Sequence, residues 1–94
     1  MTTKTKPFLI DEYLETDEDI KAFLTDMAEN GTPDEFIGAL GVAAKAKGMT
    51  AIAKQAGVSR ASLYKSLSED GKPKFETIDK IVHALGFKLT IQSL

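Results

Sequence analysis

The stretch AKQAGVSRASLYKSL, from Ala53 to Leu67, decides the fold expected for this chain of 94 residues. A helix-turn-helix needs a small residue where its second helix crosses the first, and a turn residue that tolerates positive φ. Ala53 is the small residue, Gly57 is the turn, and Ser59 can cap the second helix. The stretch therefore predicts two short helices, Met49 to Ala56 and Arg60 to Leu67, joined at a fixed angle.

The second of these helices carries polar and basic residues on the face turned away from its apolar contacts. Ile52, Val58 and Leu63 are the expected apolar contacts between the two helices. This leaves five residues to face outward: Arg60, Ala61, Ser62, Tyr64 and Lys65. When such a helix enters a major groove, its first backbone N–H groups and its cap meet phosphate, and its side chains reach base edges. Double-stranded DNA is therefore the expected ligand.

Individual residues of this stretch have distinct expected roles. Arg60 can pair with guanine or clamp a phosphate, and Lys65 lies one turn further along. Thr50 begins the first helix, close to where a DNA backbone would pass. Three flanking lysines can contact phosphates and so set the salt dependence of binding: Lys54, Lys72 and Lys74. The alternative is that these helices only form a core, with Arg60 and Lys65 as solvated charges and Tyr64 as a half-buried packing residue.

Three further helices are expected around this pair. TDEDIKAFLTDMAENG has Thr16 or Asp17 as its cap, and TPDEFIGALGVAAKAKG opens with a capping box of Thr32 and Glu35 around Pro33. FETIDKIVHALG forms the last helix. The residues expected to be buried recur at helical spacing: Ile20, Phe23, Leu24, Met27, Phe36, Ile37, Leu40, Ala44, Ile52, Ala53, Ala56, Leu63, Leu67, Ile78, Ile81, Val82 and Leu85.

The last residues change to a period of two. In FKLTIQ, residues 87–92, the apolar Phe87, Leu89 and Ile91 alternate with polar residues, as in a β-strand. A lone strand leaves its backbone unpaired, so it needs a partner, either the FLI segment of residues 8–10 or a second copy of the chain. The fold class expected is all-α, with five helices and one C-terminal strand. The single domain 1–94 divides into an acidic segment and helix (1–31), a helix-turn-helix core (32–86) and the strand (87–94).

Composition excludes several kinds of chemistry. The chain has no cysteine and one histidine, so thiolate zinc sites and multi-histidine metal sites are excluded, and no cofactor or metal is expected. Neither a nucleophile arrangement around Ser59 or Ser62 nor a phosphate-cradling glycine loop is present, so an enzyme is not expected. No apolar run is long enough to span a membrane, and the first residues lack the apolar region of a signal peptide. These features favour a cytoplasmic protein.

Charge is divided between the two parts of the sequence. Residues 1–40 hold ten acidic residues against three lysines, giving −7, while residues 41–94 hold nine basic residues against four acidic ones, giving +5. Such a division suggests an anionic partner for the second part and a basic partner for the first. It is equally consistent with solvated helix faces whose charges happen to segregate.

These residues carry a resemblance to a known family. The chain resembles the addiction-module antidote proteins, HigA-like antitoxins with a helix-turn-helix of the phage-repressor (XRE) type. Text of the form ARxxGLSRxSLYKAL in that family corresponds to AKQAGVSRASLYKSL here, and similarity extends through residues 11–31 and 36–89. Met49 stands where repressors of the wider class often have glutamine, so no operator sequence is carried over.

The resemblance implies a function with two partners. It implies the antitoxin of a type II module, a homodimer that neutralises a small basic toxin of the RelE/ParE superfamily and represses its own operon. Five apolar residues beside the acidic ones are the expected toxin anchors: Phe8, Leu9, Ile10, Tyr13 and Leu14. The alternative for this segment is that it only covers the protein's own helices. Two other functions stay open, a stand-alone phage-type repressor and a helical module that binds only protein.

Overall fold

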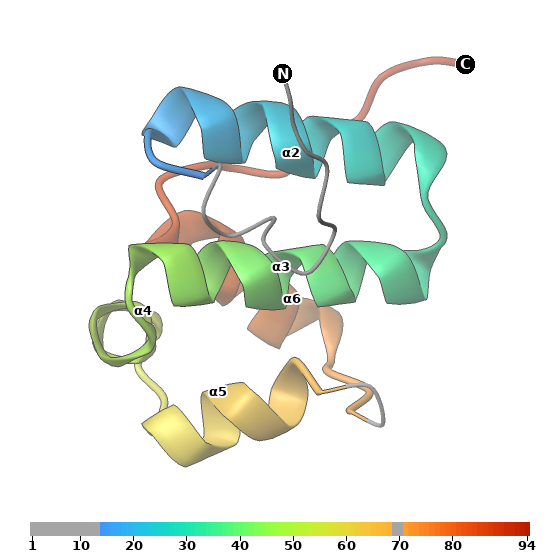
Figure 1. Cartoon of the computed structure of the whole chain (residues 1–94). Helices are drawn as coiled ribbons and strands as arrows, with labels where there is room; N and C mark the ends of the chain where they lie inside the picture. Colours follow the sequence, from blue (N-terminus) through green and yellow to red (C-terminus); the bar gives the residue numbers. More distant parts are fainter. Residues whose placement is uncertain (1–13, 69–70) are drawn as a thin grey trace.

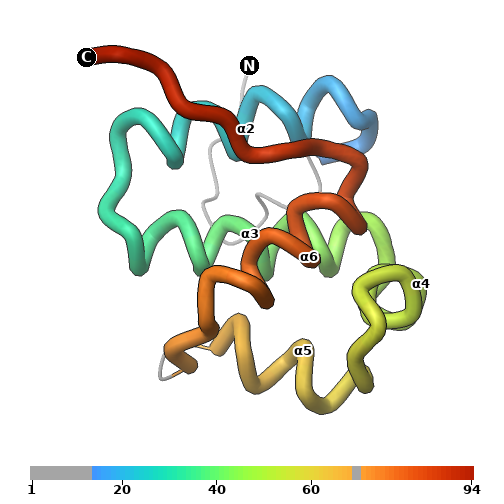
Figure 2. Tube along the Cα trace, turned by 180° about the vertical axis from the view of Figure 1, so that it is seen from behind, coloured from blue at the N-terminus to red at the C-terminus, as the bar shows by residue number. Residues whose placement is uncertain are grey.

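The computed structural model describes residues 14–68 and 71–94, and this part of the chain is all-α, as predicted. It contains five helices (Figure 1): α2 (Asp17–Asn30), α3 (Pro33–Lys47), α4 (Met49–Ala56), α5 (Arg60–Ser66) and α6 (Phe75–Ala84). The long helices α2 and α3 pack against each other, and α3 turns by 112° into α4. Helix α6 packs on α3 and α4, while α5 packs on α4. Consequently, α5 and α2 lie on opposite sides of α3 (Figures 1 and 2).

The two long helices begin with the same local device. Thr32 Oγ1 accepts a hydrogen bond from the Glu35 backbone N–H at 3.1 Å, and the Glu35 carboxylate accepts one from the Thr32 N–H at 2.8 Å. Thr16 and Asp19 form the equivalent pair in α2, both at 3.1 Å. Each box satisfies two backbone N–H groups that the helix itself leaves unpaired. The predicted box at α3 is confirmed, and of the two candidate caps for α2 the structure selects Thr16.

The core lies between the helices and is built from every one of them. Four large side chains are almost completely buried: Leu40, Leu63, Ile81 and Leu85. Most of the predicted apolar residues are buried or packed against the core, but Ile37 is only half-buried and stands outside that cluster. Four buried hydrophobic residues were not in the predicted set: Leu14, Ala39, Ala43 and Met49. Small alanines on α3 let neighbouring helices approach closely, and this is a consequence of packing that periodicity alone does not reveal.

The described chain does not form the predicted C-terminal strand, and of the two predicted pairing partners the FLI segment lies outside the described residues. Residues 87–94 contain no strand and run beside α2 (Figure 2). Helix α6 ends at Ala84, and the chain turns away from it at Gly86, with φ 98°, after which the Phe87 N–H donates to the Val82 carbonyl at 3.1 Å. The physical reason is that alternation only sorts side chains to two sides, whereas a strand also needs a neighbouring backbone to accept and donate hydrogen bonds.

Two kinds of feature are absent from the described residues. No single helix there is both long enough and apolar enough to cross a membrane, and α3 with α4 reaches that length only as a pair bent by 112°. Within residues 14–68 and 71–94, no group of three potential metal-binding side chains is found.

Candidate nucleic-acid interface

The turn between α4 and α5 has the geometry that the sequence predicts. Gly57 lies in the left-handed region, with φ 76° and ψ 29°, which glycine adopts without steric cost. Its N–H donates to the Lys54 carbonyl at 3.2 Å, and the Val58 N–H donates to the Ala53 carbonyl at 3.0 Å. These two bonds close the end of α4 as a Schellman motif. The direction in which α5 leaves α4 is therefore fixed by backbone hydrogen bonds.

Ser59 is the cap of α5, as predicted. Its Oγ accepts a hydrogen bond from the Ser62 backbone N–H at 3.0 Å and donates one to Ser62 Oγ at 2.9 Å. The hydroxyl hydrogen of Ser59 is therefore already donated within the chain. The Ser62 hydroxyl, which accepts from Ser59, keeps its own hydrogen for an outside acceptor.

Arg60 connects the two helices at this end of the molecule. Its Nη1 donates to Thr50 Oγ1 of α4 at 3.3 Å, and its Cζ lies 5.6 Å from the centroid of the Tyr64 ring, one turn along α5. A guanidinium over an aromatic face is attracted by the ring quadrupole. These contacts restrict the side chain of Arg60, which is nevertheless exposed and has more N–H donors than the bond to Thr50 uses. The structure thus brings together three of the predicted DNA-binding residues.

Tyr64 lies in a positive electrostatic environment. Its side chain is exposed (43%), and its pKa is lowered from the usual value, first by hydrogen bonding with the Arg60 side chain and then by the positive charges of Arg60 and Lys45. Desolvation opposes this shift. Lys45 belongs to the last turn of α3 and was not among the predicted DNA-binding residues. It could not have been found from local spacing, because only the bend between α3 and α4 brings it near Tyr64.

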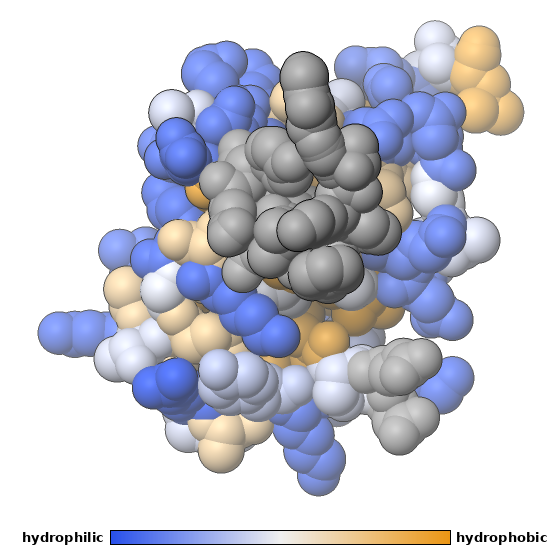
Figure 3. Space-filling view, viewed as in Figure 1, coloured by the Kyte–Doolittle hydropathy of each residue, from blue (hydrophilic) through white to orange (hydrophobic). Residues whose placement is uncertain are grey.

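The basic residues of α5 are not neutralised by the described part of the chain. The two ion pairs found there are Lys47 with Asp17, at 2.7 Å, and His83 with Asp79, at 3.5 Å. Neither involves Arg60 or Lys65. Figure 3 shows mostly hydrophilic side chains over α2, and blue and pale side chains with some apolar ones among them over α5. The outer face of α5 is therefore basic, hydrophilic and available to a partner.

Of the other predicted DNA-binding residues, Lys54 is exposed in the last turn of α4, and the rest divide into two groups. Ala61, Ser62 and Lys65 are exposed on α5, near Arg60. Lys72 and Lys74 are also exposed, but they follow the C-terminal end of α5, and Lys74 is the N-cap of α6 (Figure 1). They therefore lie at the opposite end of α5 from the Arg60 cluster.

The predicted toxin anchors lie almost wholly outside the described residues. This holds for Phe8, Leu9, Ile10 and Tyr13. Leu14 is described, and its side chain is a member of the buried core with 8% exposure. Within the described chain Leu14 thus covers the protein's own helices, and the role of the segment in toxin binding stays a prediction.

These observations define the class of the protein as a small all-α domain with an exposed basic helix on one side and acidic helix starts on the other. Residues 4–93 match the family model described as "Probable addiction module antidote protein", and the chain belongs to this family. It is also similar to an uncharacterized protein of Haemophilus influenzae (strain ATCC 51907 / DSM 11121 / KW20 / Rd), with 37% identity over 92 residues that cover 98% of this chain and 95% of that protein. No solved structure gives a significant match. Membership indicates the antidote role in a toxin–antitoxin system, a role whose proteins are generally not enzymes.

Proposed function

We propose that the protein is a homodimeric antitoxin that binds operator DNA through α4 and α5, a helix-turn-helix of the phage-repressor type, and neutralises a RelE/ParE-like toxin. It represses its own operon and acts in the cytoplasm. The observation that carries the DNA-binding half is the cluster of Arg60 with Thr50 and Tyr64. A guanidinium held by Thr50 and Tyr64 loses less side-chain freedom on binding than a free one.

The proposed contacts follow from the exposed face of α5. Arg60 and Lys65 present cationic groups, while Ala61, Ser62 and Tyr64 provide a small surface, a hydroxyl donor and an aromatic edge. Arginine is the residue best suited to bidentate contacts with guanine or phosphate. Thr50 and Ser59 support this face, and Lys72 and Lys74 extend the phosphate contacts beyond the far end of α5.

The DNA-binding half is tested by fluorescence anisotropy on the DNA upstream of the protein's own gene, at a series of salt concentrations. We expect binding that weakens steeply with salt, with a slope of about −0.9 for each phosphate neutralised. Changing both Arg60→Ala and Lys65→Ala is expected to lower the affinity at least tenfold and to flatten this slope. Lys21→Ala is the matched control, because it removes an exposed lysine from α2, on the other side of α3. Absence of binding at low salt would leave a module that binds only protein.

The proposed toxin-binding half rests on the surface of α2. A toxin that handles RNA is expected to be basic, and α2 exposes Glu18, Asp26 and Glu29 along a shallow hollow. Opposite charges steer two proteins together and favour the correct partner. The apolar residues 8–10 and Tyr13 precede α2 in the sequence, so they remain the proposed anchors for the toxin.

Co-purification with the protein encoded by the adjacent reading frame tests the toxin-binding half. We expect a stable complex, weakened at least tenfold by the combined changes Glu18→Gln, Asp26→Asn and Glu29→Gln. The matched control is Lys65→Ala, which alters charge on α5 and is expected to leave the complex intact. A neighbouring protein that is acidic, or a complex that ignores the three changes on α2, would contradict the proposal.

A further inference from the structure

The segment that follows α6 becomes progressively less covered by the rest of the described chain. Phe87 packs against the core, Leu89 is 38% exposed and Ile91 is 97% exposed. After the bond from the Phe87 N–H to the Val82 carbonyl, no further backbone hydrogen bond from residues 88–94 is found in the described part. The apolar end of the chain also projects from a hydrophilic rim (Figure 3). Residues 88–92 thus combine backbone groups that have no hydrogen-bond partner among the described residues with uncovered apolar side chains, as an unpaired edge strand does.

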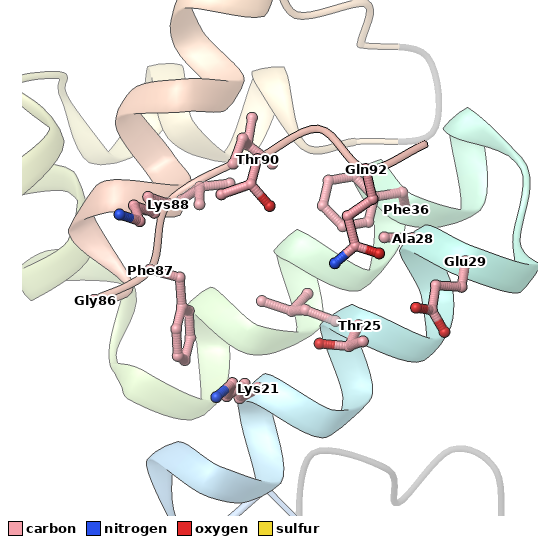
Figure 4. Close-up of a pocket in the computed structure, with 13 residues that line it drawn as sticks. Lys21, Thr25, Ala28, Glu29, Phe36, Gly86, Phe87, Lys88, Thr90 and Gln92 are labelled. Atoms are coloured by element: carbon pink, nitrogen blue, oxygen red, sulfur yellow. The ribbon is translucent and has the colours of Figure 1, made fainter. Parts of the chain in front are cut away.

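A groove lies directly beside this segment. It has a volume of about 890 Å³ and is bounded by α2, by Phe36 of α3 and by residues 86–92 (Figure 4). Its apolar lining includes Leu24 and Ala28 of α2. In Figure 4 the Phe87 ring points from the segment toward α2. The groove is open, so apolar side chains from a second chain can extend the contact that Phe87 begins.

We propose that residues 88–92 pair in antiparallel fashion with the same residues of a second copy, with the two Thr90 residues opposite each other. This deepens, and rests on, the homodimer of the proposed function. Two identical antiparallel strands are related by a twofold axis, so one register fixes every pair. In this register Lys88 lies opposite Gln92, and Leu89 lies opposite Ile91. The exposed Ile91 of each copy therefore gains an apolar neighbour that is anchored on the other copy.

Charge and existing hydrogen bonds exclude the competing registers. A register centred on Lys88 would set two ammonium groups opposite each other, which destabilises a strand pair. One centred on Leu89 would bring Phe87 into the ladder, although its N–H is already bonded to Val82. A shift of the partner by a single residue would set apolar side chains opposite polar ones. A register centred on Ile91 would set Leu89 opposite Ser93 and Lys88 opposite Leu94, so of these registers only the one centred on Thr90 avoids Phe87 and pairs apolar residues with apolar ones throughout.

The position of the segment is compatible with the proposed DNA contacts. Residues 87–94 run beside α2, and α5 lies on the other side of α3 in both views (Figures 1 and 2). Pairing through residues 88–92 therefore leaves α5 of each copy uncovered. The alternating sequence of residues 87–92 forms no strand in the described chain, and the proposed dimer supplies the backbone partner that a strand needs.

Cysteine cross-linking tests the register, because the chain has no cysteine of its own. Opposite residues in an antiparallel pair lie about 4.5–5.5 Å apart at Cα, within the range of a disulfide. Under mild oxidation Thr90→Cys is expected to give mostly covalent dimer on a non-reducing gel. Lys88→Cys and Gln92→Cys are expected to cross-link poorly alone, since each lies about 13 Å from its own copy across the axis. Mixed together, these two variants are expected to form the heterodimer.

Light scattering with a charged variant provides the second measurement. The unmodified protein is expected to be a dimer at micromolar concentration, and Ile91→Lys is expected to be a monomer with unchanged helical circular dichroism. Ser68→Lys, at an exposed position after α5, is the matched control and is expected to stay dimeric. A monomeric unmodified protein, or Thr90→Cys that cross-links no faster than Ser68→Cys, overturns the proposal. Neither assay contains DNA or toxin, so its failure is separate from any failure of the proposed binding functions.

Discussion

The helix pairs α2–α3 and α4–α5 use their charged residues in different ways. Asp19 and Glu35 close the capping boxes of the long helices, and Asp17 pairs with Lys47 at 2.7 Å. Arg60 and Lys65 on α5 have no carboxylate partner in the described residues. Acidic groups at a helix start favour that helix through its dipole, so part of the acidity of the first pair is explained by folding.

The difference between the pairs indicates where charge is available to a partner. Folding does not account for the basic residues of α5, since the helix is held by Leu63, its one buried residue, and by the backbone turn at Gly57. A surface charge without a local partner contributes little to stability and much to association. The same reasoning separates the acids of α2: Asp19 serves the cap, whereas Glu18 and Glu29 make no hydrogen bond or ion pair found in the described residues.

The largest expected effect is the loss of the apolar anchor of α5. Leu63→Ala is expected to lower the free energy of unfolding by about 2–5 kcal/mol, because it removes a fully buried side chain and leaves a cavity. Urea denaturation followed by circular dichroism measures this value. Lys65→Ala, on the exposed face of the same helix, is expected to change it by less than about 0.5 kcal/mol. Equal effects for the two variants would show that α5 is not anchored through Leu63.

A second test compares two glycines, one in each helix pair. Gly57→Ala is expected to lower the free energy of unfolding by about 1–2 kcal/mol, because a side chain at φ 76° is strained. Gly38→Ala is expected to raise it by up to about 1 kcal/mol, since Gly38 is helical and a methyl group there would meet nothing within 4 Å. Thermal melts of the two variants should therefore move in opposite directions. A common direction would contradict the assigned turn.

A smaller effect distinguishes acidic residues that serve folding from those left for a partner. Thr32→Ala is expected to lower the free energy of unfolding by about 1 kcal/mol, because the capping box of α3 loses its hydroxyl. Glu29→Gln, on the exposed face of α2, is expected to stay within about 0.5 kcal/mol of the unmodified protein. Chemical denaturation measures both. If Glu29→Gln proves as costly as the cap variant, the acidity of α2 serves stability and not a partner.

The smallest expected effect concerns the ionisation of Tyr64. Its pKa is lowered chiefly by the Arg60 side chain, because the guanidinium favours the phenolate over the phenol. The phenol therefore titrates at a lower, but still alkaline, pH than a free tyrosine. In a Tyr13→Phe background Tyr64 is the only tyrosine, and its ultraviolet titration reports it alone. Arg60→Gln is expected to move this titration to higher pH. Lys65→Gln is the control and should move it less, so an equal shift would mean that general surface charge is responsible.

Local signals allowed much of the fold to be predicted. Thr32 with Glu35, Ser59 and Gly57 act through neighbours within a few residues, and the structure places each in its predicted role. The candidate site was predictable in part, because the exposed face of α5 follows from helical periodicity. The contribution of Lys45 and the bond from Arg60 to Thr50 were not, because both depend on how separate helices meet.

The expected C-terminal strand shows what local sequence signals do not predict. Phe87, Leu89 and Ile91 alternate correctly, yet a strand is a property of two backbones, and the described chain supplies only one. By itself, the sequence determined the helix starts, the turn after α4 and the separation of acidic from basic residues, because these depend on short-range sterics and hydrogen bonds. Only the tertiary structure decided which charges have partners, which alanines are core, and that residues 87–94 lie beside α2, because packing brings together atoms far apart along the chain.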